Sequence, residues 1–357
     1  MNSTRIFART SLMAVIGLAV LILIGVIYPG TWLLDTMTGL FASGLLVMSL
    51  HLLVGYTGLV SFGHAAYFAS GGYIFGMLLQ ADGVVAVLGG WAVPIATLVA
   101  LLGTGGFALF VGLICARLSE IYFAFLTLAF QMLLVSAIQG LVQYTGGDQG
   151  LTGGIPRPEF LGLNLVEVKD RYVFSAFLFM AGLLVIRLVT LSSFGATLRM
   201  VRDNETRTAF LGINTYRVKV AAFTIAGMIA GLGGVILAIF TSAAYPEWAG
   251  WAVSGEAIFM IMLGGLHSFY GPLLGVVVMR AINDITLIYT THTRIWPKAL
   301  PSCSWCWLVL QRGILDWILD RHTRHAPQTR HLRGSNHIAG TDQDSKGDER
   351  CCILIIW

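Results

Sequence analysis

The sequence predicts an all-α, polytopic integral membrane protein with about eight to ten transmembrane helices, several of them broken by glycine. Of its 357 residues, 56% are hydrophobic and only 11% are charged, whereas soluble domains carry about 25% charged residues. The apolar runs last 15 to 23 residues without the alternation of a barrel strand, which indicates helices. The 42 glycines agree with this prediction, because small residues let helices approach closely in lipid.

The predicted spans follow one another along residues 1–320, which we expect to form one transmembrane domain. The first span follows Arg5 and Arg9 and superficially resembles a signal peptide. Its apolar run is too long for a typical signal peptide and no small-residue cleavage site follows it, so we expect an uncleaved first helix. The ten expected spans are 11–28, 33–54, 65–80, 92–114, 121–142, 172–191, 220–240, 252–266, 272–289 and 299–319.

The basic residues predict how the chain is oriented. If Arg5 and Arg9 stay in the cytoplasm, Arg117 and the segment 192–219 also fall inside, as the positive-inside rule requires. The segment 143–171 then faces outward, and it holds three basic residues against four acidic ones. We therefore expect 192–219 to be a cytoplasmic loop and 143–171 to be an outer loop.

Glycines interrupt several of the predicted helices. One break runs from Gly55 to Gly63, another lies at Gly71 and Gly72, and a third runs from Gly264 to Pro272. The residues at 58–63 and 265–271 are similar to each other. Interrupted helices at corresponding places in two halves of a chain indicate the substrate region of a transporter, and simple close packing is the alternative.

Four stretches, in this order and at this spacing, carry a resemblance to a known family. They are Gly55–Tyr67, Ile121–Phe130, Thr145–Pro156 and the segment from Phe194 to Asn214. Together they resemble the branched-chain amino acid ABC transporter permeases of the LivM type, over about residues 35 to 298.

The resemblance implies a multi-pass subunit of the bacterial inner membrane that pairs with a homologous permease of the LivH type. It also implies two cytoplasmic ATP-binding subunits and a periplasmic substrate-binding protein. The cargo would be leucine, isoleucine or valine, although similar permeases carry urea, amides or other amino acids. The chain itself should be no enzyme and bind no cofactor, because it lacks G-x-x-x-x-G-K-[ST], H-E-x-x-H and G-x-S-x-G motifs.

The cytoplasmic segment 192–219 is the expected contact with the ATP-binding subunits. Permeases of related type carry an E-A-A-x-x-x-G coupling loop here, but Glu205 and Gly212 are seven residues apart instead of six, and the distal I-x-L-P is missing. A solvated face that only sets orientation is the alternative. The candidate coupling residues are Arg199, Arg202, Asp203, Asn204, Glu205, Gly212, Ile213 and Asn214.

A neutral or zwitterionic amino acid needs a path with small residues and a few hydrogen-bonding groups, and we expect no fixed charge along it. The glycine break before the third predicted span offers both, although its histidine is equally suited to packing against a helix carbonyl. The glycine-rich outer loop is either a tight turn or a contact for the substrate or its delivery protein. The candidate pathway residues are Gly55, Tyr56, Thr57, Gly58, Ser61, Gly63 and His64, and the outer-loop candidates are Thr145, Gly146, Gly147 and Gly150.

Three ionisable residues fall at membrane depth, where charges are costly and face the protein interior. Arg280 and Asp284 have the i, i+4 spacing of an intrahelical ion pair, so we expect structural pairing. An ion-coupled secondary transporter, the rival interpretation, would need a set of acidic groups at this depth. Only Glu256 and Asp284 qualify.

The C-terminal part departs from the resemblance after Lys298. Residues 321–357 form a polar tail, and we expect either a shifted reading frame or a basic disordered tail. Cys303 and Cys306 form a C-x-x-C, but no second pair follows at zinc spacing, so we expect no metal site.

Overall fold

The computed structural model describes residues 17–23, 30–81, 83–118, 120–151, 154–159, 163–266 and 268–292. These ranges are overwhelmingly helical and form no named strand, which confirms the predicted all-α class. Several expectations lie wholly or mostly outside the described residues. They are the position of Arg5 and Arg9, the first span 11–28 apart from residues 17–23, the span 299–319, the Cys303–Cys306 pair, and the tail 321–357 with its suspected frame shift.

In the described part of the chain, five helical segments are long and apolar enough to cross a membrane. Four of them coincide with a predicted span to within five residues at either end, and the fifth, Val84–Cys115, begins eight residues before the predicted span 92–114. Three shorter or more polar helices, α3 (His64–Gln80), α12 (Trp251–Gly264) and α13 (Gly271–His292), complete the bundle. The five segments are α2 (Thr31–Thr57), Val84–Cys115 with α5 (Ala92–Cys115) at its end, α6 (Glu120–Gly140), α8 (Val168–Leu191) and α11 (Thr215–Thr241).

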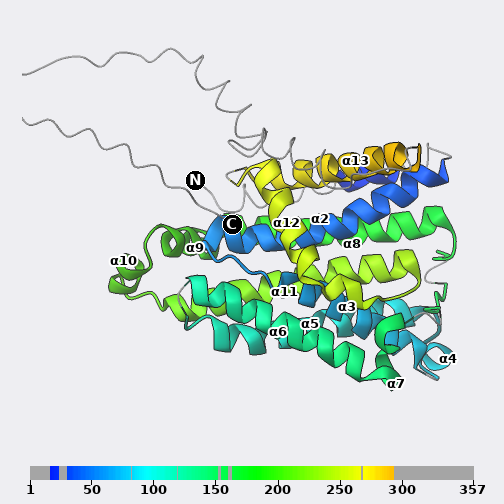
Figure 1. Ribbon diagram of the computed structural model, residues 1–357, viewed down its shortest axis with the longest axis horizontal. Coiled ribbons are helices and arrows are strands. Elements are labelled where there is room, and N and C mark those ends of the chain that lie inside the picture. Colours follow the sequence, from blue (N-terminus) through cyan, green and yellow to red (C-terminus); the bar gives the residue numbers. More distant parts are fainter. Residues whose placement is uncertain are drawn as a thin grey trace, which may run out of the picture.

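Most of the long helices run lengthwise between two ends of the molecule, whereas α12 crosses them (Figure 1). One end, here called the α9–α10 end, carries α9 (Ser193–Asp203) and α10 (Glu205–Phe210). Arg117 lies at this end too, with its guanidinium carbon 5.5 Å from the centre of the Tyr216 ring. The basic segments predicted to share one side of the membrane therefore do share one end of the bundle.

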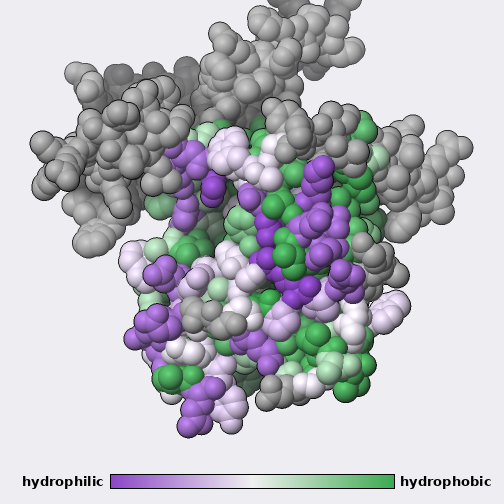
Figure 2. All heavy atoms as spheres, turned by 90° about the vertical axis from the view of Figure 1, so that its right-hand side faces the viewer, coloured by the Kyte–Doolittle hydropathy of each residue, from purple (hydrophilic) through white to green (hydrophobic). Residues whose placement is uncertain are grey.

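The opposite end, here called the α7 end, carries α4 (Val84–Leu88) and α7 (Val142–Thr145). Figure 2 looks onto this end, where hydrophilic side chains spread over much of the described surface. The expected outer loop 143–171 pairs there with the residues that follow α11: the Leu151 amide donates to the Ala244 carbonyl at 2.8 Å, and the Ile155 amide donates to the Ser242 carbonyl at 3.0 Å.

Helix α11 is the central helix and packs against α2, α3 and α5. A Cβ at Gly71 would overlap the Gly231 backbone, and one at Gly234 would overlap the Phe68 carbonyl, so α3 and α11 touch backbone to backbone. Such contact between small residues is what holds helices together in lipid. By contrast, only 22% of the α6 span is buried, which places α6 at the periphery.

Candidate functional site

Helix α3 begins inside the bundle, beside the middle of α2. The His64 Nε2 atom lies 2.9 Å from the Ser49 hydroxyl, and Ser49 precedes the end of α2 at Thr57 by eight residues. At 1.5 Å per residue, the start of α3 therefore lies about 12 Å from the end of α2, toward the middle of the bundle. The connection 58–63 folds back from the α9–α10 end before α3 begins (Figure 1).

Two glycines make this return possible. Gly58 ends α2 with φ of 77°, the left-handed conformation that favours glycine. At Gly63, just before α3, a Cβ would overlap the Thr127 carbonyl of α6. The predicted glycine break is therefore a structural requirement, because the chain turns sharply at its first glycine and touches another backbone at its last.

The side chains at the start of α3 leave two buried polar atoms without partners. The Ser49 hydroxyl donates to the Leu46 carbonyl at 2.7 Å, so its single proton is used and His64 Nε2 must be the donor in their shared bond. His64 Nδ1 is then an acceptor. Neither this atom nor the Ser61 hydroxyl, both fully buried, has a hydrogen-bond partner in the part of the chain that the structure describes.

Helix α12 also starts inside the bundle and meets α3 there. The Ala65 amide donates to the Ser254 hydroxyl at 2.9 Å, and that hydroxyl donates to Gln131 Oε1 at 3.2 Å. Gln131 Nε2 in turn donates to the Ala249 carbonyl at 2.7 Å. The sequence did not predict this buried series of hydrogen bonds, although Gln131 stands out as a polar residue within the apolar run of α6.

The expected coupling segment rests on the expected pathway segment. Arg202 of α9 donates from Nη1 to the Gly55 carbonyl near the end of α2, and its side chain also lies against Gly58. The Arg199 guanidinium carbon lies 6.0 Å from the centre of the Tyr56 ring. Residues about 145 positions apart in the sequence therefore meet. The distance between Arg199 and the Tyr56 ring is within the range of a cation–π contact.

The other coupling candidates shape α10 and its ends. Asn204 caps α10 by accepting from the Arg207 amide at 2.8 Å, and Asn214 caps α11 in the same way at 3.1 Å from the Arg217 amide. Glu205 lies 2.7 Å from Lys219 Nζ. Gly212 has φ of 84°. Asp203 is the exposed last residue of α9, and Ile213 is half-buried before α11.

Two exposed apolar residues beside these polar ones escaped the sequence analysis. Phe210 is 87% exposed and Leu211 is 64% exposed, at the end of α10, which projects from the bundle (Figure 1). Their apolarity alone could not single them out in a chain that is 56% hydrophobic.

The outer-loop candidates form a tight turn. The buried Thr145 hydroxyl donates to the Leu141 carbonyl at 2.9 Å and accepts from the Gly147 amide at 3.2 Å. A Cβ at Gly146 would overlap the Gly150 carbonyl, so the glycines keep the turn closed. Contact with a substrate or delivery protein stays a prediction.

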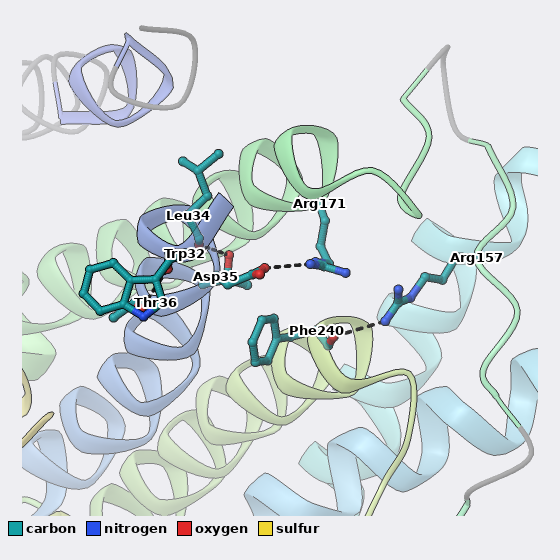
Figure 3. Close-up of polar contacts among 8 residues, drawn as sticks. Trp32, Leu34, Asp35, Thr36, Arg157, Arg171 and Phe240 are labelled. Atoms are coloured by element: carbon teal, nitrogen blue, oxygen red, sulfur yellow. Dashed lines mark hydrogen bonds and ion pairs between the residues drawn. The ribbon is translucent and has the colours of Figure 1, made fainter. Parts of the chain in front are cut away.

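Two arginines at the α7 end, Arg157 of the outer loop and Arg171 in the first turn of α8, make contacts with other helices (Figure 3). Arg171 pairs with Asp35 of α2 at 2.7 Å, and Arg157 Nη2 donates to the Phe240 carbonyl at 3.1 Å. Burial, aided by repulsion from Arg171, lowers the pKa of Arg157 below its usual value. Arg157 therefore holds the outer loop against α11, and Arg171 holds the start of α8 against α2.

A cavity of about 280 Å³ lies between α2, α11, α12 and α13, with Phe68 of α3 also on its wall. Glu256 and Arg280 line it. The Arg280 Nε atom lies 3.2 Å from Asp284 Oδ1, which confirms the predicted i, i+4 pair. The described residues contain no group of three or more His, Cys, Asp or Glu side chains arranged to hold a metal ion.

Comparison with known proteins supplies independent findings. A sequence model of the family described as "Branched-chain amino acid transport system / permease component" matches residues 32–310. The high-affinity branched-chain amino acid transport system permease protein LivM of Salmonella typhimurium is 29% identical over 319 residues, covering 81% of this chain and 72% of the relative. LivM of Escherichia coli is 28% identical with the same coverage, 81% and 72%.

The name of a more distant relative states a different cargo. The autoinducer 2 import system permease protein LsrC of Salmonella choleraesuis is 24% identical over 205 residues, covering 54% of this chain and 56% of the relative. No solved structure matches the chain.

Proposed function

Because this chain belongs to the branched-chain amino acid transport permease family, as its resemblance to LivM-type permeases predicted, we propose that it is the membrane-spanning subunit of a bacterial inner-membrane ABC importer. Its cargo is leucine, isoleucine or valine. Its partners are a LivH-type permease, two cytoplasmic ATP-binding subunits and a periplasmic substrate-binding protein. The names of the LivM relatives support the cargo class. The contact of Arg202 with Gly55 is the observation that carries the mechanism.

The α9–α10 end is the docking face for the ATP-binding subunits. It gathers the basic residues that the positive-inside rule assigns to the cytoplasm. At its tip, Phe210 and Leu211 are exposed, and large apolar side chains exposed together next to water are typical of a protein contact. A groove on an ATP-binding subunit that accepts these two side chains would grip α10 directly.

The ATP-binding subunits then act on the pathway through α9. They can shift the conformational equilibrium of this chain only if they contact its two states differently. Movement of α9 would pull on the end of α2 through Arg202, and Gly58 directly follows that end. The connection 58–63 leads to the meeting point of α3 and α12, where Ser61 and His64 hold unpartnered polar atoms among the described residues. We place the gate there.

The face formed by α12 and α13 is where the sister permease packs. The Arg280 side chain is 48% exposed, although it lies near the middle of α13. Ionisable groups at this depth avoid lipid and face protein or a water-filled cavity. A second permease covering this face would remove the exposed charge from lipid and enclose the adjoining cavity.

Reconstitution of the whole importer in proteoliposomes tests the proposal. We expect leucine uptake to require ATP inside the vesicles and to persist with ionophores. Uptake that collapses with ionophores while ATP remains intact would instead establish an ion-coupled transporter.

A matched pair of variants tests the docking face. Phe210→Asp should release the ATP-binding subunits during purification and abolish uptake. Val87→Asp, at an 84% exposed position near the α7 end, should retain both. Full assembly and uptake with Phe210→Asp would disprove docking at the α10 tip.

A further inference from the structure

The cavity between α2, α11, α12 and α13 has the size and lining of a small-ligand site. Its volume of about 280 Å³ would hold roughly nine water molecules at about 30 Å³ each, which is room for a leucine. Leu46, Val47, Met260 and Val276 are among its apolar walls. Apolar walls with a few placed polar groups are typical of such sites.

Two opposite charges line this cavity from different helices. Glu256 projects from α12 and Arg280 from α13. Arg280 uses Nε to pair with Asp284, so its terminal nitrogens remain as donors for another carboxylate. Glu256 is within 3.5 Å of the neutral Asn283 amide. Among these four residues the formal charge is −1, since two carboxylates face one guanidinium.

The cavity lies on the route toward the expected gate. Phe240 on its wall is next to the end of α11 at the α7 end, and Gly39 belongs to the first half of α2, which starts at that same end. Phe68, which also lines the cavity, is one turn beyond His64 in α3. The cavity therefore lies between the ends of α2 and α11 at the α7 end and the start of α3, where we place the gate.

We propose that this cavity is a transient binding site for the amino acid zwitterion, with Glu256 holding its ammonium group and Arg280 its carboxylate. The apolar walls hold the branched side chain. The ammonium group would give Glu256 a charged partner in addition to the neutral Asn283 amide, at a depth where an unpaired charge is costly. The carboxylate would bind the terminal nitrogens of Arg280, whose Nε remains paired with Asp284. The inference rests on the proposed function, because it names the place where the importer holds its cargo after delivery.

Cysteine protection tests the site without using transport as the readout. Ser43 is half-buried on the cavity wall, so Ser43→Cys is introduced into the assembled importer after its native cysteines are replaced by serine. A water-soluble maleimide then labels it in nanodiscs without the binding protein. We expect millimolar leucine to slow labelling, and leucinol or 4-methylpentanoate, which each lack one charge, to leave it unchanged.

Variants at Glu256 and Arg280, each combined with Ser43→Cys, test which charged group of leucine each residue binds. Glu256→Gln and Arg280→Lys should each raise the leucine concentration needed for protection about tenfold or more, because each removes a charged or bidentate contact. Glu247→Gln, at an exposed glutamate of η3 (Pro246–Ala249), should leave protection unchanged. A Thr241→Cys reporter at the exposed end of α11 should show no leucine effect.

The outcomes separate this inference from the proposed function. Labelling that leucine does not slow, or protection that survives Glu256→Gln, overturns the site, even if ATP-driven uptake is normal. Protection that behaves as expected in a protein without ATP-driven uptake keeps the site and counts against the importer instead.

Discussion

Replacement of Gly63 by alanine would test whether α3 is seated on α6 as described. The added Cβ would overlap the Thr127 carbonyl, and a backbone group cannot rotate away as a side chain can. The start of α3 must therefore move away from α6, which also strains the bond between His64 and Ser49. Overpacking of this kind costs about 1–3 kcal/mol.

Thermal unfolding of the purified chain in detergent measures this cost. At an unfolding entropy of about 2.1 cal/mol/K per residue, a loss of about 2 kcal/mol lowers the Tm of a chain of 357 residues by roughly 3 °C. Gly106→Ala is the matched control, because Gly106 also lies in a span, in α5, but has nothing within 4 Å of the added Cβ. Equal Tm values for the two variants would show that α3 does not start against α6, and the proposed position of the gate would fall with it.

Three other variants test separate contacts by the same melting assay. Gln131→Ala removes both hydrogen bonds of the buried amide and should cost about 1–2 kcal/mol of stability. Gln139→Ala, on the exposed face of α6, should cost little. Similar losses for the two variants would contradict the buried hydrogen bonds of Gln131. The Lys219 side chain is only 5% exposed, so Glu205→Gln leaves a buried charge unpaired and should cost about 1 kcal/mol of stability. Lys219→Gln should cost less. The reverse order of the two losses would refute the pairing. Thr145→Val keeps the shape but removes the hydroxyl bonds of the outer turn and should cost about 1 kcal/mol, so an unchanged Tm would show that the glycines alone hold the turn.

The candidate site was predictable in part. The candidate pathway and coupling segments are predictions from glycine breaks, polar residues and a family resemblance, each of which is local in the sequence. Their contact through Arg202 and Gly55 was not predictable, because nothing in the spacing of residues 55 and 202 says that α9 folds onto the end of α2. The exposed Phe210 and the buried Gln131 were missed for a related reason, since burial depends on neighbours from distant parts of the chain.

The sequence by itself determined the class of fold, the helices and the relative orientation of the loops. Long apolar runs have no other way to satisfy their backbone in lipid, and basic loops avoid crossing the membrane, so both properties follow from local composition. Only the tertiary structure decided that α3 and α12 begin within the bundle and that Glu256 and Arg280 share a cavity. Those features depend on which glycines of different helices lie against each other. A chain with 42 glycines offers many such pairs, and the sequence does not show which of them form.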